Sequence, residues 1–209
     1  KMETSKFLDP IQILKGSDQS VTIDAALIHR GQIVAFGEKA RIEAKLLNIE
    51  ATAVPHQLLA PCLVDPHSIL EDPISGRSES LRSLIKTAAK SGYGQIGLLP
   101  KSSSWRDTPE KLKEIPNSNS DICIHLWGSF SKGGNGLELA PHGEQIKYGA
   151  IGIAEDDEMI STTLLHRGIN TGEIGNKPLL IAPRDPLLQG NGMVREGVET
   201  LRAGWVPDP

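Results

Sequence analysis

The sequence lacks the features that mark several protein classes. No apolar run approaches the ~18 residues that suggest a membrane span. Aromatic residues make up only 4% of the chain, the formal net charge is −4, and Lys and Arg do not cluster. These properties argue against a nucleic-acid surface. Small molecules or other proteins are therefore the expected partners, with no nucleic acid and no membrane among them.

Cysteine is also scarce. Only Cys62 and Cys123 occur, far apart and each within an apolar run. This predicts two reduced, buried thiols rather than a disulfide framework or a zinc site. The first six residues lack the apolar stretch of a secretory signal, so the expected location is cytoplasmic. Because the chain begins with Lys1, we also expect a trimmed or partial sequence.

Residues 1–57 carry patterns that are typical of strands and predict a small β-rich N-terminal segment. A turn is expected at residues 29–31, and a short helix is expected after Ala40. The apolar runs that predict strands are residues 11–14, 21–23, 26–28 and 33–37.

From residue 58 onward, short apolar runs alternate with helical patterns. The runs begin about 30 residues apart, which is the length of one strand-plus-helix unit. Their nearly continuous apolar character is typical of parallel strands covered on both faces. The predicted strands are residues 58–64, 93–99, 122–127, 150–154 and 178–182, and the predicted helices are 78–90, 137–148, 161–174 and 193–203.

This alternation predicts an α/β fold, with residues 58–209 forming the first part of a (β/α)8 TIM-type barrel of about five βα units. A closed barrel of this type needs roughly 250 residues, so we expect the C-terminal part of the barrel to be absent. A complete five-stranded doubly wound sheet is the structural alternative.

Each predicted strand ends in a polar cluster. Ligands of parallel α/β folds gather at the carboxyl ends of the strands, so the clusters outline a candidate site. Loops are also polar because they are solvated, and the pattern alone does not separate these two explanations. The clusters are residues 65–67, 100–102, 128–129, 155–157 and 184–185.

The segment from Leu59 to Pro73 resembles the first barrel strand of the dihydroorotases, in the cyclic-amide branch of the amidohydrolase superfamily. That family has Pro-Gly-Leu-Val-Asp-x-His-x-His-Leu-Arg-Glu-Pro here. The resemblance continues through residues 99–102, 149–157 and 194–204 in the same order and with similar spacing. It therefore covers nearly the whole chain and implies a small β-sheet domain followed by a β/α barrel.

The resemblance implies a metal site with only two ligands retained. His67 matches the first histidine of the strand-one pair, and Asp156 matches an aspartate ligand on strand four. Ile69 stands at the second histidine, and Ala182 stands at a further histidine on strand five. Neither side chain has a lone pair to donate. Catalytic zinc normally needs three protein ligands, so although the family uses zinc, we expect none to be bound here.

The substrate side of the site also departs from the family. The arginine that grips the substrate carboxylate in the family aligns with Glu71, which is a charge reversal. Lys101 aligns with a family asparagine, and Lys101 and Arg184 are the candidate substrate-binding residues, although a solvated loop lysine is the commoner case. No residue is predicted to be catalytic.

Other site types are weaker alternatives. A carboxylate-rich metal site could form from His67 together with Glu71, Asp72, Glu155, Asp156 and Asp157, but such acidic clusters are usually solvated. His125 and Trp127 are expected to face the same side of a strand and could line the barrel mouth. The glycines of residues 131–136 invite a phosphate-loop interpretation, yet the Gly-Lys-Ser/Thr ending is absent, and we expect an ordinary loop.

Two functional hypotheses remain open, and they leave open whether the chain is an enzyme. The first is a non-catalytic dihydroorotase-like protein of pyrimidine biosynthesis that acts as an interaction or assembly partner. The resemblance suggests aspartate transcarbamoylase as that partner, with self-association as a further possibility. The second is an active cyclic-amide hydrolase with altered ligands, which converts carbamoyl aspartate to dihydroorotate.

Overall fold

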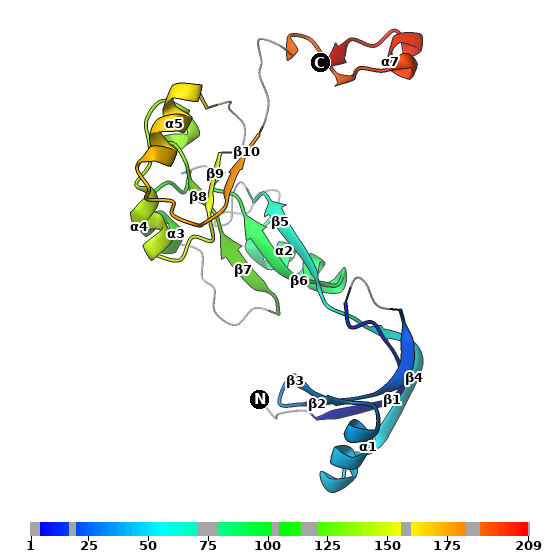
Figure 1. Cartoon of the computed structure of the whole chain (residues 1–209). Coiled ribbons are helices and arrows are strands. Elements are labelled where there is room, and N and C mark those ends of the chain that lie inside the picture. The colour runs from blue at the N-terminus through cyan, green and yellow to red at the C-terminus, as the bar shows by residue number, and fades with distance from the viewer. Residues whose placement is uncertain are drawn as a thin grey trace. The chain divides into compact units, whose positions relative to one another are not determined.

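The computed structural model describes residues 5–16, 20–70, 79–101, 105–113, 121–155, 160–182 and 189–208. The chain divides into two compact units, Lys1–Cys62 and Leu63–Pro209 (Figure 1). No helix in these described ranges is long and apolar enough to cross a membrane.

The first unit is a four-stranded sheet with one helix. Its elements are β1 (Lys6–Ile13), β2 (Thr22–His29), β3 (Gln32–Phe36), α1 (Gly37–Leu46) and β4 (Ala51–Leu59), and the strand order is β3-β2-β1-β4. Arg30 and Gly31 close the β2–β3 hairpin with φ angles of 53° and 74°, as a two-residue turn with both residues left-handed requires. Helix α1 packs Ala40 and Ala44 onto the sheet, where Leu27 is fully buried.

The second unit alternates strands and helices. In chain order its elements are β5 (Leu63–Ser68), α2 (Leu81–Lys90), β6 (Tyr93–Leu98), α3 (Pro109–Lys113), β7 (Cys123–Leu126), β8 (Gly128–Ser129), η1 (Lys132–Gly134), α4 (His142–Lys147), β9 (Ile153–Glu155), α5 (Thr162–Asn170) and β10 (Leu179–Ile181). A small parallel pair, β11 (Val194–Arg195) and β12 (Pro207–Asp208), flanks α7 (Val198–Ala203).

Apart from the β11-β12 pair, the strands of this unit form two parallel sheets, β5-β6-β7 and β10-β9-β8. Trp127 lies between β7 and β8, and its backbone N donates to the carbonyl oxygen of Leu98 on β6 at 2.9 Å. The backbone N of Ile151 donates to the carbonyl oxygen of Leu126, also at 2.9 Å. Strand neighbours in space therefore follow chain order from β5 to β10, as they do in a β/α barrel.

Two apolar cores fix the helices to one face of these strands. Ile96, Leu98 and Ile124 pack against α2, and Phe130 and Ile153 pack against α4 and α5. Because side chains alternate along a strand, the residues between them face the opposite side, which we call the inner face. Helix α2 begins at a capping box in which Ser80 Oγ accepts from the Ser83 backbone N at 3.2 Å.

The mixed α/β class predicted from the sequence is confirmed, whereas several details are wrong. The helices predicted at 137–148 and 193–203 are shorter, with α4 at His142–Lys147, α7 at Val198–Ala203 and the strand β11 before α7. The predicted strand 58–64 is divided, because Leu59 ends β4 on the N-terminal sheet and Leu63 begins β5. Cys62 and Cys123 are free, as expected, but both are exposed rather than buried. Cys62 lies where the two units divide, and Cys123 starts a strand, so neither side chain reaches a core.

Candidate functional site

The corner at Asp65, Pro66 and His67 is an irregular part of β5. Asp65 pairs with Ile96 and Ser68 pairs with Leu98, so Pro66 and His67 together stand opposite a single residue of β6. The Asp65 carboxylate accepts from the His67 backbone N at 2.9 Å and from Ser68 Oγ at 2.5 Å. Asp65 is thereby held on the helix-facing side of the strand, while the His67 side chain is exposed.

Ile69 occupies the inner face next to His67. Ser68 and Leu70 are both buried toward the helices, which turns Ile69 to the opposite face, with 39% of its surface exposed. This is the position at which the resemblance places a second histidine ligand. The aliphatic side chain leaves the corner with one imidazole.

Trp127 fills the inner face beside this corner. Its indole Nε1 donates to the carbonyl oxygen of Pro66 at 2.8 Å, and the side chain packs with Leu99 and Ala154. Two glycines make room for it. A Cβ on Gly97 would lie 3.0 Å from Trp127 Nε1, and one on Gly152 would lie 2.6 Å from Trp127 Cζ3.

His125 lies on the same face as Trp127, as the sequence predicts. Its Nε2 is 2.9 Å from Oε1 of Gln95 on β6, the partner strand of β7. The amide oxygen is an acceptor, so Nε2 carries the proton in this pair. The hydrogen bond to Gln95 accounts for the polar ring of His125, so its position does not require a bound ligand.

The four predicted site residues divide into two groups. His67 lies in β5 and Lys101 follows the paired strand β6, and Lys101 is half-buried. Asp156 and Arg184 lie outside the described residues, as do Glu71 and the neighbouring acidic residues Asp72 and Asp157. Among the described residues, no group of three His, Cys, Asp or Glu side chains could hold a metal ion. The described donors therefore do not fit a catalytic zinc ion.

A buried polar cluster lies at the ends of β8 and β9. Glu155 is 3% exposed, and its carboxylate accepts from the Ser131 backbone N at 3.0 Å and from Ser131 Oγ at 2.5 Å. Gln145 of α4 bonds both the backbone N and the carbonyl oxygen of Ser129. His142 Nε2 donates to the carbonyl oxygen of Phe130 at 2.7 Å. These bonds hold the start of the β8–α4 loop to its own helix and to β9.

A second loop is fixed to the first by Trp105 and Asp107. Trp105 Nε1 donates to Ser129 Oγ at 2.8 Å, and its ring lies against Gly134, where an added Cβ would come within 2.0 Å of it. The Asp107 carboxylate accepts from the Gly133 backbone N at 2.8 Å and from Lys111 Nζ at 2.7 Å. The loops after β6 and β8 are therefore joined at the carboxyl ends of the strands.

The glycine-rich loop does not present its backbone donors to an anion. Each backbone N from residue 132 to residue 137 donates within the protein, to Glu138 O, Asp107 Oδ2, Ser131 O, Lys132 O, Ser131 Oγ and Asn135 Oδ1 in turn. Lys132 also bonds Glu138 at 2.9 Å and lowers the pKa of that carboxyl. The phosphate-loop interpretation is thus excluded by geometry, and the expected ordinary loop is found.

Sequence reasoning found part of this cluster. Ser129 and Glu155 belong to the polar strand ends that were singled out, whereas Trp105, Asp107 and Gln145 were missed. These three lie in a loop or on a helix with no periodic signal of their own. The sequence signal for this cluster was Glu155, a glutamate directly after the apolar run of residues 150–154.

Comparison with known proteins shows what the chain is similar to. No protein-family profile matches it. A probable dihydroorotase-like protein from Synechocystis is 30% identical over 228 residues, which cover 97% of this chain and 49% of that protein. A dihydroorotase from Lactococcus lactis is 26% identical over 186 residues, which cover 88% of this chain and 43% of that protein. The chain spans about half the length of these curated relatives.

Solved structures show the same fold. The L-hydantoinase (dihydropyrimidinase) from Arthrobacter aurescens matches 87% of this chain and 41% of its own, with a TM-score of 0.65 and 16% identity. A dihydroorotase matches 90% of this chain and 54% of its own, with a TM-score of 0.60 and 14% identity.

Proposed function

The chain is related to the dihydroorotases and to the wider amidohydrolase group, and from this relation we propose that it belongs to a non-catalytic dihydroorotase-like protein of pyrimidine biosynthesis. In this proposal it forms the first five units of a β/α barrel, which serves as an interaction or assembly module. His67 and Asp156 are the remnants of a zinc site that no longer assembles.

The arrangement on the inner face carries the proposal. The resemblance places the family's ligands on that face, at the carboxyl ends of the strands. There the chain has Ile69 directly after β5 and Ala182 after β10, and the indole of Trp127 is bonded to the Pro66 carbonyl group. Zinc lowers the pKa of its bound water and so supplies the hydroxide of this chemistry. The apolar side chains named here cannot hold zinc, which supports a role other than hydrolysis.

A binding role follows from what the chain retains. The fold and the joined loops at the strand ends are intact in the described residues, although three family ligand or substrate positions carry Ile69, Glu71 and Ala182. A protein that keeps the fold but lacks the residues for hydrolysis can still present a surface that binds another protein. Aspartate transcarbamoylase, which the resemblance suggests, is the partner to test first, and self-association is the second.

The deciding experiment is metal analysis of the full-length protein together with an assay of carbamoyl aspartate and dihydroorotate interconversion. We expect substoichiometric zinc and no turnover. We also expect co-elution with aspartate transcarbamoylase in size-exclusion chromatography. Stoichiometric zinc with turnover would instead establish the alternative, an active cyclic-amide hydrolase in which Lys101 and Arg184 receive the anionic substrate.

A further inference from the structure

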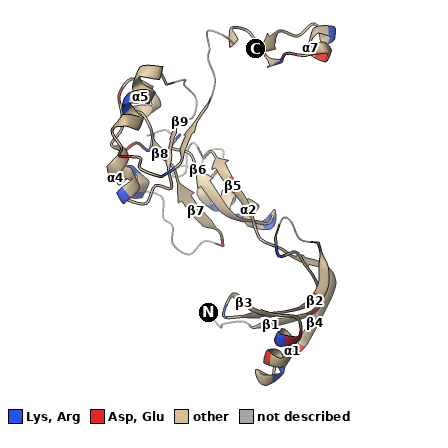
Figure 2. Cartoon of the chain, in the orientation of Figure 1, with Lys and Arg blue, Asp and Glu red and all other residues tan. Residues whose placement is uncertain are grey.

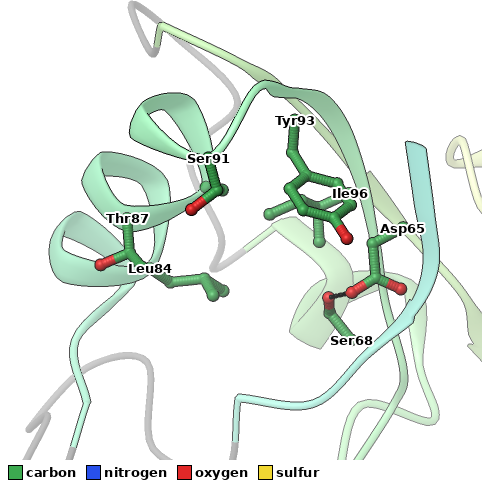
Figure 3. Close-up of a pocket in the computed structure, with 8 residues that line it drawn as sticks. Asp65, Ser68, Leu84, Thr87, Ser91, Tyr93 and Ile96 are labelled. Atoms are coloured by element: carbon green, nitrogen blue, oxygen red, sulfur yellow. Dashed lines mark hydrogen bonds between the residues drawn. The ribbon is translucent and has the colours of Figure 1, made fainter. Parts of the chain in front are cut away.

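A cavity of about 190 Å³ lies between α2 and the strands β5 and β6 (Figure 3). It is on the helix-facing side of the sheet, so it is separate from the inner face that carries Trp127. Figure 3 shows Asp65 and Tyr93 on the strand side of it and Thr87 and Ser91 on the helix side, with the hydroxyl oxygens of Thr87 and Ser91 turned away from Asp65.

Asp65 gives the cavity a negative charge. Its carboxylate is half-buried and is fixed by the His67 backbone N and by Ser68 Oγ, which are both neutral donors. None of the described residues that line the cavity is basic. The basic residues of α2, which are Arg82, Lys86 and Lys90, are exposed and do not line the cavity. Figure 2 colours the lysine and arginine residues of the chain blue.

The size of the cavity limits the ligand. Pockets for drug-sized molecules are usually about 300 Å³ or more, and a water molecule takes about 30 Å³ of liquid volume. A cavity of about 190 Å³ therefore suits a molecule of only a few heavy atoms.

The chemistry of the lining favours an organic cation over a metal ion. Ca²⁺ and Mg²⁺ take six or more oxygen ligands, often from several carboxylates, whereas Asp65 is the one carboxylate among the described lining residues. An ammonium group is attracted both by a carboxylate and by an aromatic face such as that of Tyr93. Leu84 and Ile96 offer apolar surface to a short alkyl chain.

We propose that the cavity between α2, β5 and β6 binds a small primary ammonium compound, with Asp65 as the counter-ion and Tyr93 against the cationic group. The site goes beyond the proposed function and does not depend on whether the protein is catalytic.

Isothermal titration of the full chain at neutral pH with ethanolamine hydrochloride tests the proposal. Ethylene glycol is the matched neutral probe, since it replaces the ammonium group with a hydroxyl group. We expect saturable binding of ethanolamine and none of ethylene glycol. Asp65→Asn keeps the shape of the side chain, removes the charge, and is expected to weaken ethanolamine at least about tenfold.

Two further variants keep the result interpretable. Glu79→Gln removes a carboxylate just before α2 that does not line the cavity, and it should leave the affinity unchanged. Tyr93→Leu removes the aromatic ring that the proposal places against the cationic group, and it should weaken ethanolamine binding a few-fold even if Asp65→Asn fails to fold. Absence of saturable binding, equal affinity for the neutral probe, or equal losses in Asp65→Asn and Glu79→Gln would overturn the proposal.

Discussion

The indole Nε1 of Trp127 donates a hydrogen bond of 2.8 Å to the carbonyl oxygen of Pro66, which lies two strands away on β5. The bond crosses the intervening strand β6 above Gly97, where an added Cβ would lie 2.8 Å from the Pro66 carbonyl oxygen and 3.0 Å from the indole Nε1. It ties the strand that carries His67 to the centre of the inner face. The corner at residues 65–67 is therefore held by packing and by a backbone contact.

Replacement of Trp127 by alanine should strongly destabilise the second unit. The side chain is 6% exposed, and truncation of a buried aromatic residue typically costs about 3–5 kcal/mol of the free energy of unfolding. Urea denaturation followed by circular dichroism measures this change. Trp205→Ala is the matched control, because Trp205 is 58% exposed and should change stability by less than about 0.5 kcal/mol. Similar losses in the two variants would contradict the packing described for Trp127.

Gly134 and Gly136 provide a matched pair in the glycine-rich loop. Both have left-handed φ angles, of 64° and 69°, so alanine at either position costs about 1 kcal/mol of backbone strain. At Gly134 a Cβ would also collide with the Trp105 ring, whereas at Gly136 nothing lies within 4 Å. Gly134→Ala should therefore be the less stable variant by a further ~1–3 kcal/mol, with altered tryptophan fluorescence. Equal melting temperatures would show that Trp105 does not rest on Gly134 in solution.

Glu155→Gln should weaken the buried cluster at the ends of β8 and β9. Hydrogen bonds to a charged group contribute about 1.5–3 kcal/mol, and the carboxylate accepts two of them from Ser131. Glu138→Gln in the following loop is the control, since that side chain is exposed and its ion pair with Lys132 is screened by salt. Thermal unfolding should show a larger loss of stability for Glu155→Gln than for Glu138→Gln. The opposite order would contradict the structural role given to Glu155.

Restoring the missing ligands tests why zinc is not expected. The double variant Ile69→His and Ala182→His supplies imidazoles at the two positions where the resemblance places them. We expect its zinc affinity to rise at least about tenfold above that of the original chain, because three or more protein ligands are then available. Addition of His67→Ala should abolish the gain. A gain that survives this third substitution would mean that zinc binds elsewhere.

Much of the fold followed from local pattern. The runs at residues 93–99, 122–127, 150–154 and 178–182 each contain a strand, because strands covered on both faces need continuous apolar sequence. The single strand predicted at residues 58–64 was wrong, because this apolar run is shared between two sheets. Leu58 and Leu59 belong to one sheet and Leu63 and Val64 to another, and an apolar run does not record which partner strand it pairs with.

The candidate site was less predictable. The side of the strand on which Asp65 and His67 lie depends on the register shift between Asp65 and Ser68, which has no sequence signature. The contact between Trp127 and Pro66 joins residues 61 positions apart, and only the packed sheet reveals it. The roles of Asp156 and Arg184 stay predictions, since both lie outside the described residues.

The indole of Trp127 requires glycine at positions 97 and 152. A lineage that gains a side chain at either glycine must first lose the indole, because both added carbons would meet its ring atoms. Loss of the indole alone would not free either position, because an added Cβ would still lie 2.8 Å from the Pro66 carbonyl oxygen at Gly97 and 2.4 Å from the Pro178 carbonyl oxygen at Gly152. Among homologous sequences, tryptophan at this position should therefore coincide with glycine at both of the others, whereas the two glycines are expected without tryptophan as well.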